Sequence, residues 1–233
     1  MSTPGEPKKA RGRPPLGLVP EPVTEGFPGH VSFVKSAAAM RDAPSSTLAE
    51  VAFCGRSNGG KSSLINTLCN RRQLARVSTT PGRTRLINFF DVQGRVMLVD
   101  LPGFGFATGD KAEVTAWGET IRGYLDDRRQ LALTLLLFDA RRGPEREEEE
   151  LLLWFRHAGR PCLAVMTKSD KIGRSELETR RRKSADILQL HPADVIAFSS
   201  LTRLGREPLW GAILAAAKVF TSEAPGTADE VGP

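Results

Sequence analysis

The stretch GRSNGGKS, Gly55 to Ser62, decides the fold of this chain of 233 residues. It follows a short apolar run, opens a stretch of helical periodicity, and matches the phosphate-binding pattern G-x-x-x-x-G-K-[ST]. Glycines let a backbone wrap closely around phosphates, and the N-terminus of the following helix adds positive potential. Lys61 would reach the β- and γ-phosphates, and the Ser62 hydroxyl would bind Mg²⁺. A merely flexible glycine-rich loop is the competing interpretation, and the strand–loop–helix context disfavours it.

Six short apolar runs, each bounded by Gly, Pro or Asp, predict β-strands. They are Glu50–Cys54, Leu86–Val92, Arg95–Val99, Leu131–Phe138, Cys162–Met166 and Val195–Phe198. The turn Gln93–Gly94 predicts an antiparallel hairpin, while helical stretches separate the other strands, which should be parallel. The predicted fold class is α/β, with three layers: a six-stranded, mostly parallel sheet with one antiparallel hairpin strand, covered by helices on both faces.

Start signals predict where several helices begin. Pro144 suits the first position of a helix rich in glutamate, and Ser175 with Glu178 suggests a capping box. Apolar residues at helical spacing after Asp110 predict another helix. The final helix should span about Arg206–Phe220.

Composition divides the chain into one domain and two tails. Residues 1–28 hold seven of the sixteen prolines and four basic side chains, which predicts a disordered basic arm. Residues 29–221 should form one domain of alternating strands and helices, and the small, acidic stretch 222–233 should be a second disordered tail.

The composition also excludes several classes of protein. No apolar run approaches the roughly 18 residues that span a bilayer, and the N-terminus lacks the apolar middle of a secretory signal. The three cysteines have no CxxC spacing, which argues against a disulfide framework or a cysteine zinc site. We therefore expect a cytoplasmic protein with no membrane partner. The net charge of +6 leaves a nucleic-acid partner open.

Polar segments follow three later strands, at the edge where doubly wound sheets bind ligands. In DLPG (100–103), Asp100 can hold Mg²⁺ through a water and the Gly103 amide can meet a γ-phosphate. In TKSD (167–170), Asp170 can accept two hydrogen bonds from guanine, and the stem of Lys168 can lie along the base. In FSS, Phe198–Ser200, backbone amides can point towards guanine O6. Each segment alone reads as an ordinary turn or polar loop, but their order after the phosphate loop favours a guanine nucleotide site.

These motifs resemble those of one protein family. The runs GRSNGGKSSLIN (55–66), TPGRTRLINFF (80–90) and DLPGFGFA (100–107), with TKSD and FSS, closely resemble the EngB-type GTPases. Those are small bacterial ribosome-biogenesis GTPases of the group that includes TrmE, Era and EngA. The resemblance covers about residues 30–220 and implies a P-loop GTPase fold. It implies a monomeric switch that binds and hydrolyses GTP and assists assembly of the large ribosomal subunit, with its precursor or rRNA as partner. Some members are also linked to cell division.

The resemblance further implies roles for individual residues. Thr84 is the expected second Mg²⁺ ligand beside Ser62, and Asp100 binds the ion through water. No catalytic residue is assigned beyond this phosphate and metal site, in which Lys61 and Thr84 take part. The residues expected to contact GTP or GDP are Gly55, Arg56, Ser57, Asn58, Gly59, Gly60, Lys61, Ser62, Gly82, Arg83, Thr84, Arg85, Leu86, Asp100, Leu101, Pro102, Gly103, Thr167, Lys168, Ser169, Asp170, Phe198, Ser199 and Ser200.

Three positions bear on how well this site would work. Gly59 stands where the family usually has Val, which should loosen the loop slightly without removing an N–H donor. Phe104 stands where many small GTPases have a Gln that positions the attacking water, so hydrolysis by the isolated protein should be slow. For Asn58, the related group suggests a K⁺ ligand, and simple hydrogen bonding within the loop is an equal alternative.

Two other functions compete with a GTPase switch. One is a protein that binds rRNA or DNA through the basic arm and keeps a nucleotide only as a structural feature. The retention of Lys61, Ser62, Thr84 and Asp100 argues against it, because a degenerate site need not keep all four. The other is an RNA-modification GTPase, against which the lack of any additional catalytic or substrate domain counts.

Two basic stretches have modest interpretations. The run RRRK, Arg180–Lys183, lies in a predicted helix, where a solvated face is favoured over rRNA contact. The stretch ARGRPP (10–15) contains the R-G-R-P core of minor-groove peptides. One short copy favours nonspecific RNA attraction or an inert tail over specific DNA recognition.

Overall fold

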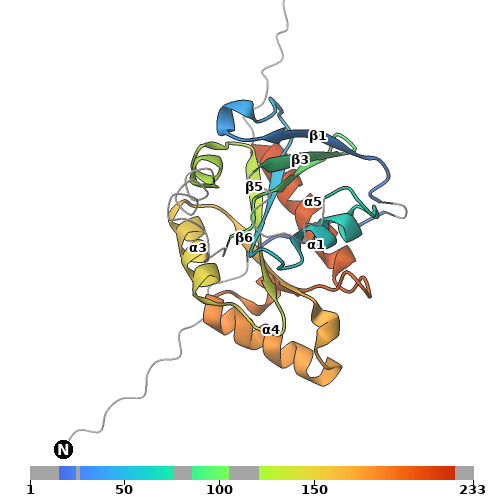
Figure 1. Ribbon diagram of the computed structural model, residues 1–233, viewed down its shortest axis with the longest axis vertical. Coiled ribbons are helices and arrows are strands. Elements are labelled where there is room, and N and C mark those ends of the chain that lie inside the picture. Colours follow the sequence, from blue (N-terminus) through green and yellow to red (C-terminus); the bar gives the residue numbers. More distant parts are fainter. Residues whose placement is uncertain (1–15, 25–26, 76–85, 105–120, 224–233) are drawn as a thin grey trace, which may run out of the picture.

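Within the part of the chain that the structure describes, a seven-stranded sheet has the order β1-β3-β4-β2-β5-β6-β7 (Figure 1). The computed structural model describes residues 16–24, 27–75, 86–104 and 121–223. Parallel pairing joins β4, β2, β5, β6 and β7, so their carboxyl ends share one edge. The strands are β1 Val31–Ala37, β2 Glu50–Gly55, β3 Ile87–Val92, β4 Val96–Asp100, β5 Leu131–Asp139, β6 Cys162–Thr167 and β7 Val195–Ala197.

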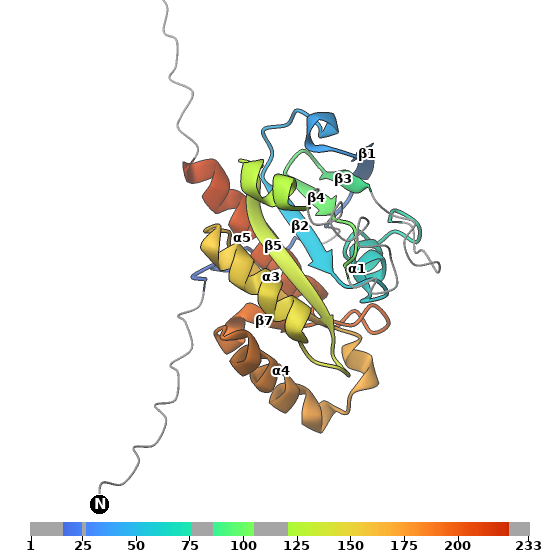
Figure 2. The ribbon, with the colours of Figure 1, turned by 60° about the vertical axis from the view of Figure 1, so that its left-hand side comes forward.

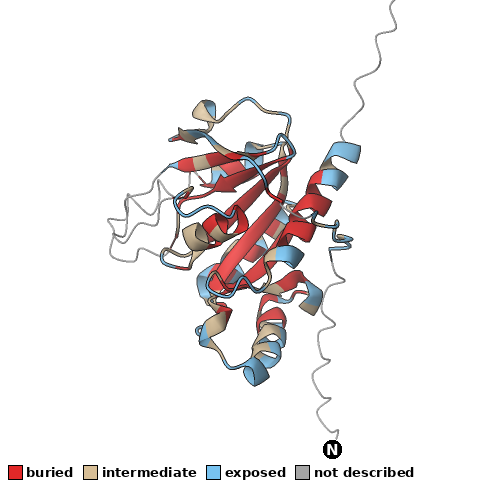
Figure 3. Cartoon of the chain, turned by 90° about the vertical axis from the view of Figure 1, so that its right-hand side faces the viewer, coloured by how far each residue is buried: buried red, intermediate tan, exposed pale blue. Residues whose placement is uncertain are grey.

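Helices cover both faces of this sheet, which confirms the three-layer α/β architecture. The α-helical segments that the structure describes are α1 Lys61–Leu68, residues 121–127, α3 Arg146–His157, α4 Arg174–Leu188 and α5 Arg206–Glu223. Helices α1 and α5 bury their apolar sides in one core cluster, and residues 121–127, α3 and α4 do so in the other. Figure 2 shows α3 and α5 on opposite faces, and Figure 3 shows the buried strands between them. None of the described helices combines the length and the apolarity that crossing a bilayer requires.

The predicted hairpin is confirmed as the antiparallel pair β3–β4. Gln93 and Gly94 link these strands with φ angles of 57° and 64°. Positive φ at both central residues is the mark of a type I′ turn, whose twist matches that of the flanking strands.

The prediction of six strands is wrong by one, because β1 was not recognised. Strand β1 pairs antiparallel with β3 at the edge of the sheet, and its register shifts between Phe33 and Lys35. Phe33 and Val34 are both exposed, at 54% and 42%. An edge strand with an irregularity does not keep the alternation of buried and exposed residues from which strands are predicted.

Two helix starts also differ from the prediction. Helix α3 has Glu145 as its N-cap in a reciprocal capping box with Glu148, so Pro144 lies just before the cap. Helix α4 follows Gly173 without any side-chain cap, so the expected box of Ser175 and Glu178 is wrong. The helix expected after Asp110 is seen over 121–127, and its earlier part lies outside the described residues.

Residues 16–24 and 27–28, part of the range 1–28 that composition predicts to be disordered, contact the domain. The Leu16 N–H donates to the Asp194 carboxylate at 3.2 Å, and the Glu21 N–H donates to the Gly211 carbonyl at 3.1 Å. The ring of Phe27, which is 6% exposed, packs edge-on against Trp210. Composition missed this because the segment finds its hydrogen bonds on another element rather than within itself. Residues 1–15 and 25–26 lie outside the described ranges, and at the other end α5 continues two residues into the predicted tail.

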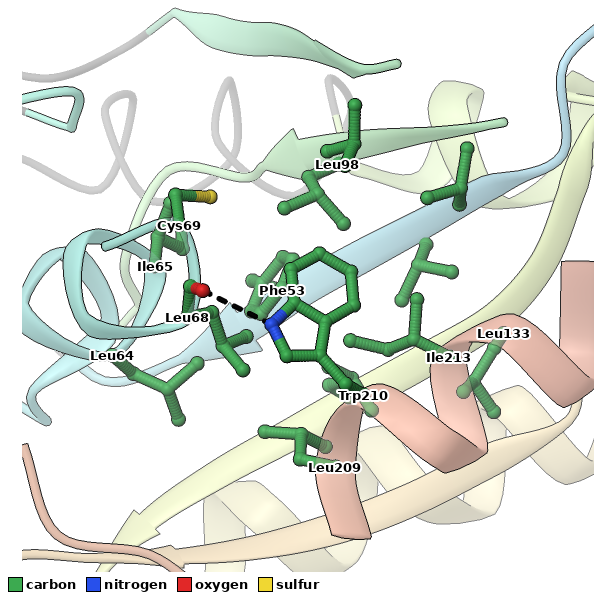
Figure 4. Close-up of a cluster of buried hydrophobic side chains, with 14 of the residues drawn as sticks. Phe53, Leu64, Ile65, Leu68, Cys69, Leu98, Leu133, Leu209, Trp210 and Ile213 are labelled. Carbon is green, nitrogen blue, oxygen red and sulfur yellow. Dashed lines mark hydrogen bonds between the residues drawn. The ribbon is translucent and has the colours of Figure 1, made fainter. Parts of the chain in front are cut away.

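Helix α5 holds the carboxyl end of α1. The Trp210 indole N–H donates to the Leu68 carbonyl at 3.0 Å, inside the core shown in Figure 4. The Arg206 guanidinium donates to the carbonyls of Thr67 and Leu68 at 3.1 and 3.0 Å. The last carbonyls of a helix have no partner within it, so these contacts satisfy them and fix α1 against the sheet.

Candidate nucleotide-binding site

The glycine-rich loop turns directly from β2 into α1. Asn58 and Gly60 take left-handed conformations, with φ of 60° and 90°, and α1 begins at Lys61. Gly55 ends β2 against β5, where an added Cβ would lie 2.9 Å from the Leu137 carbonyl oxygen. Only glycine fits there. The predicted strand–loop–helix arrangement is therefore present, and the free N–H groups of the first helical turn point towards the loop.

Two residues at the end of β6 hold this loop in place. The Thr167 hydroxyl donates to the Gly59 carbonyl at 2.7 Å, and Lys168 Nζ donates to the Asn58 carbonyl at 2.8 Å. The Gly59 N–H in turn donates to the Arg56 carbonyl at 2.9 Å. The N–H donor of Gly59 is retained, as expected, although both backbone groups of this residue are engaged within the protein. An added Cβ would lie 2.8 Å from the Arg56 oxygen.

Lys61 and Asp100 form an ion pair at the carboxyl edge of the sheet. Their side chains are 11% and 7% exposed, because Asp100 ends β4 beside β2 while Lys61 opens α1. Ser62 follows in the first turn of α1. A carboxylate and a hydroxyl beside an ammonium fit a hydrated Mg²⁺ bound to phosphate, since Mg²⁺ prefers oxygen ligands and takes few of them from the protein.

The segment after Asp100 is joined to the phosphate loop through its backbone. The Phe104 N–H donates to the Gly55 carbonyl at 3.2 Å, and the Ser57 N–H donates to the Phe104 carbonyl at 2.9 Å. Gly103 packs so closely that an added Cβ would lie 2.7 Å from Ser57 Oγ. The Phe104 ring is buried in an apolar cluster. This position therefore presents no polar side chain that could orient a water.

The Asp170 carboxylate is held by a hydroxyl from the loop that follows β7. The Ser199 hydroxyl donates to Asp170 Oδ1 at 2.7 Å, and this hydrogen bond holds the pKa of the carboxyl below its usual range. Ser199 itself is fully buried and lies two residues after β7. This hydrogen bond joins the TKSD and FSS motifs, which are far apart in the sequence. The role of the Ser199 side chain was not predicted, although its place after a strand was a signal.

The backbone amides of FSS differ from the prediction. The Phe198 N–H donates to the Met166 carbonyl at 2.8 Å, and the Ser199 N–H donates to the Leu204 carbonyl at 3.1 Å. Both are used by the fold, because β7 must pair with β6 and the following turn must close. Of the three FSS amides, that of Ser200 alone has no hydrogen-bond partner within the described part of the chain.

The remaining expected residues fall into three groups. Leu101, Pro102 and Ser169 are buried inside their motifs, and the Ser169 hydroxyl donates to a carbonyl of β6. Leu86 lies just before β3 and is 40% exposed. The four others, Gly82, Arg83, Thr84 and Arg85, lie outside the described residues.

A cleft of about 420 Å³ beside the phosphate loop is lined in part by charged residues that lie outside the sequence motifs, among them Asp139 and Glu145. Asp139, the last residue of β5, pairs with Lys168 at 3.0 Å. Burial alone would raise the pKa of Asp139, but hydrogen bonds from Arg141 and Lys168 hold it well below its usual range. Across the cleft, Arg56 pairs with Glu145 at the start of α3. Asp139 ends an apolar strand, as Asp100 does, and this position is the signal in the sequence that indicates it.

The basic run in α4 forms pairs on the helix itself. Arg180 pairs with Glu176, and both Arg181 and Arg182 pair with Glu178. Arg182 and Lys183 are exposed, which agrees with the favoured interpretation of a solvated helix face. Arg180 and Arg181 are half-buried, and they also donate to the carbonyls of Arg141 and Pro192.

Known proteins match this chain over most of its length. Residues 50–168 match the family described as "50S ribosome-binding GTPase". The "Probable GTP-binding protein EngB" of Syntrophus aciditrophicus (strain SB) is 50% identical over 177 residues, which cover 76% of this chain and 90% of that protein. The chain belongs to the EngB family. The EngB protein of Alkaliphilus metalliredigens (strain QYMF) is 45% identical over 181 residues, covering 77% of this chain and 87% of that protein.

Solved structures agree on the fold. A crystal structure of a probable GTP-binding protein EngB superposes with a TM-score of 0.62 at 23% identity, over 73% of this chain and all of that one. Era in complex with MgGDPNP and a 16S ribosomal RNA fragment gives 0.57 at 22% identity, over 73% of this chain and 57% of Era. The expected P-loop GTPase fold is confirmed. As an EngB-family protein the chain is a GTPase, an enzyme class that uses Mg²⁺.

Proposed function

We propose that this EngB-family GTPase is a GTP-dependent switch that assists assembly of the large ribosomal subunit. The observation that carries the proposal is the single edge where β2, β4, β6 and β7 bring together the phosphate loop, Asp100, TKSD and FSS. The match to a family described as 50S ribosome-binding supports the large subunit as the partner. A requirement for the protein in cell division would follow indirectly, from a shortage of ribosomes.

In this proposal each part of the site has its own role. Backbone N–H groups at the start of α1 and the Lys61 ammonium bind the phosphates, and Ser62 ligates Mg²⁺ directly. Asp100 holds the ion through water, and Thr84 is the second direct ligand. Bound Mg²⁺ neutralises charge that develops on the phosphates. Asp170 accepts two hydrogen bonds from guanine, a pattern that adenine does not offer.

Hydrolysis should be slow without help, because Phe104 offers no group that orients water. Potassium would supply the missing charge if the exposed Asn58 side chain binds it beside the phosphates. Turnover measured in KCl and in NaCl tests this, with and without ribosomal particles. Faster turnover in KCl supports the K⁺ role, and equal rates in all conditions exclude it and leave Asn58 with loop hydrogen bonding.

Depletion of the protein from growing cells tests the biological role. Large-subunit precursors should accumulate while small-subunit particles stay normal. Re-expression of the wild-type chain should restore the profile, and re-expression of Asp100→Asn should not. Normal particles after full depletion would rule out the assembly role.

A further inference from the structure

Three exposed arginines gather where the end of α1 meets the loop that precedes α5. They are Arg71, Arg72 and Arg203, called here the arginine corner. The Arg203 guanidinium donates to Asn70 Oδ1 at 3.1 Å, which joins the two segments. Arg71 donates to the Gly29 carbonyl at 3.4 Å, which joins the corner to the segment before β1. Figure 2 shows this loop beside α1.

No carboxylate lies in the segments that meet at this corner. Residues 27–37, 60–75 and 198–206 contain neither Asp nor Glu. Within the described part of the chain, none of the three arginines has an ion-pair partner. The adjoining β3–β4 hairpin adds Arg95 and one carboxylate, Asp91, which accepts the Gly94 N–H at 2.7 Å. The corner therefore keeps a positive potential, unlike the paired arginines of α4.

The loop that carries Arg203 is ordered in advance. The N–H groups of Leu201 and Thr202 donate to Ser199 Oγ at 3.2 and 3.1 Å. Arg203 takes a left-handed conformation with φ of 63°, and Leu201 is 75% exposed beside it. A rigid loop that presents a guanidinium and an apolar tip loses little conformational entropy on binding.

We infer that the arginine corner binds the phosphate backbone of RNA. Guanidinium groups form bidentate hydrogen bonds with phosphates and stack on bases, which lysines do not. Three of them from two segments fit successive phosphates better than a single small anion. The exposed Leu201 can lie against a ribose or an unstacked base. The inference rests on the proposed function, in which ribosomal RNA is the partner.

The location leaves the nucleotide site accessible. The corner lies beyond the carboxyl end of α1, while Lys61 opens the same helix at the other end. Through Ser199, its loop is joined to Asp170. RNA bound at the corner would therefore contact elements that hold the nucleotide without covering the phosphate loop.

The test compares two triple variants of the full chain. Arg71→Gln/Arg72→Gln/Arg203→Gln neutralises the corner, and Arg174→Gln/Arg182→Gln/Lys183→Gln removes the same charge from exposed residues of α4. Fluorescence anisotropy with a labelled single-stranded RNA is measured from about 50 to 200 mM KCl. The corner variant should bind about tenfold more weakly and show a salt slope smaller by about 2, since each lost phosphate contact removes about 0.7. The α4 variant should stay within twofold of wild type.

Several outcomes would overturn the inference. Equal losses in the two variants would assign binding to net charge, and no loss in either would leave the corner without a role. Stronger corner-dependent binding to polyglutamate or to phosphatidylserine vesicles than to RNA would name a different partner. Unchanged GTP affinity and thermal midpoint show that the variants are folded.

Sedimentation with large-subunit particles separates this inference from the proposed function. If wild type and corner variant both bind the particles, only the arginine corner is wrong. If RNA binding depends on the corner but wild type ignores the particles, only the proposed function is wrong.

Discussion

The Ser199 hydroxyl donates a 2.7 Å hydrogen bond to the carboxylate of Asp170. The same oxygen accepts two backbone N–H groups of the loop that leads to Arg203. One buried side chain thus fixes both the carboxylate proposed to read guanine and the loop of the arginine corner. Changes at these two residues should separate base recognition from loop order.

Asp170→Asn should exchange guanine for xanthine preference, because the amide offers a donor where the carboxylate accepts. GTP affinity should fall by about a hundredfold, the value of two lost charge-assisted hydrogen bonds. Calorimetric titration with GTP and XTP measures both effects. Asp186→Asn, on the exposed side of α4, is the matched control and should change neither. Unaltered GTP binding by Asp170→Asn would remove the base assignment.

Ser199→Ala should weaken GTP about tenfold without changing base preference, because the carboxylate stays but loses its orienting hydrogen bond. It should also raise the pKa of Asp170 towards the ordinary 3.8. A lowered pKa in the folded state stabilises the protein above the unfolded-state value, and this contribution disappears as pH falls through the lowered pKa. The stability gap between wild type and variant should therefore be larger at pH 7 than in strong acid. Urea unfolding across this range checks it, and a gap that widens in acid would contradict it.

Lys61→Met should abolish GTP hydrolysis and also lower the free energy of unfolding by about 3 kcal/mol, since the buried Asp100 carboxylate loses its partner. The double variant Lys61→Met/Asp100→Asn should recover most of that stability and none of the activity. Urea unfolding and phosphate release measure the two properties. A double variant as unstable as the single one would show that the pair does not stabilise the fold.

Asn66 links α1 to the chain that follows it, at Ala75. Its side-chain amide donates to the Ala75 carbonyl at 2.9 Å, its oxygen accepts the Ala75 N–H at 2.8 Å, and both residues are buried. Asn66→Leu leaves both backbone groups unsatisfied and should cost about 2 kcal/mol of stability. Thr134→Val is the control, because the buried Thr134 hydroxyl has no partner in the described structure. Chemical unfolding should show that Asn66→Leu is clearly less stable than Thr134→Val. Equal stabilities would contradict the role of Asn66.

Phe27→Ala should cost about 3 kcal/mol, because the ring is buried against Trp210. Phe33→Ala removes the same side chain from a position that is 54% exposed and should cost far less. Thermal unfolding of the two variants compares them directly. Similar midpoints would mean that the segment before β1 adds no stability.

The sequence was most informative where chemistry requires particular residue types in order. The phosphate loop, DLPG, TKSD and the central strands were all predicted, because buried parallel strands are apolar throughout and the polar motifs follow at their ends. Strand β1 is not predicted from the sequence, because Phe33 and Val34 are both exposed at the edge of the sheet and break the alternation of buried and exposed residues. The ordered packing of residues 16–24 is not predicted either, because their hydrogen-bond partners, such as Gly211 and Asp194, are distant in the sequence.

Within the site, contacts between side chains that are far apart in the sequence could not be predicted either. Nothing in the local sequence shows that Ser199 bonds to Asp170, that Asp139 pairs with Lys168, or that Arg56 reaches Glu145. These contacts arise because parallel strands end at one edge, so they follow from the sheet order rather than from a motif.

In a GTP-dependent switch, the nucleotide state controls association with the large subunit. The most direct measurement is co-sedimentation of the full chain with large-subunit particles, in a nonhydrolysable GTP analogue and in GDP. We predict strong association with the GTP analogue and weak association with GDP. The Asp170→Asn variant should associate with the particles only in the corresponding xanthine analogue. Association that is equal in both nucleotides, or absent in both, would contradict the account.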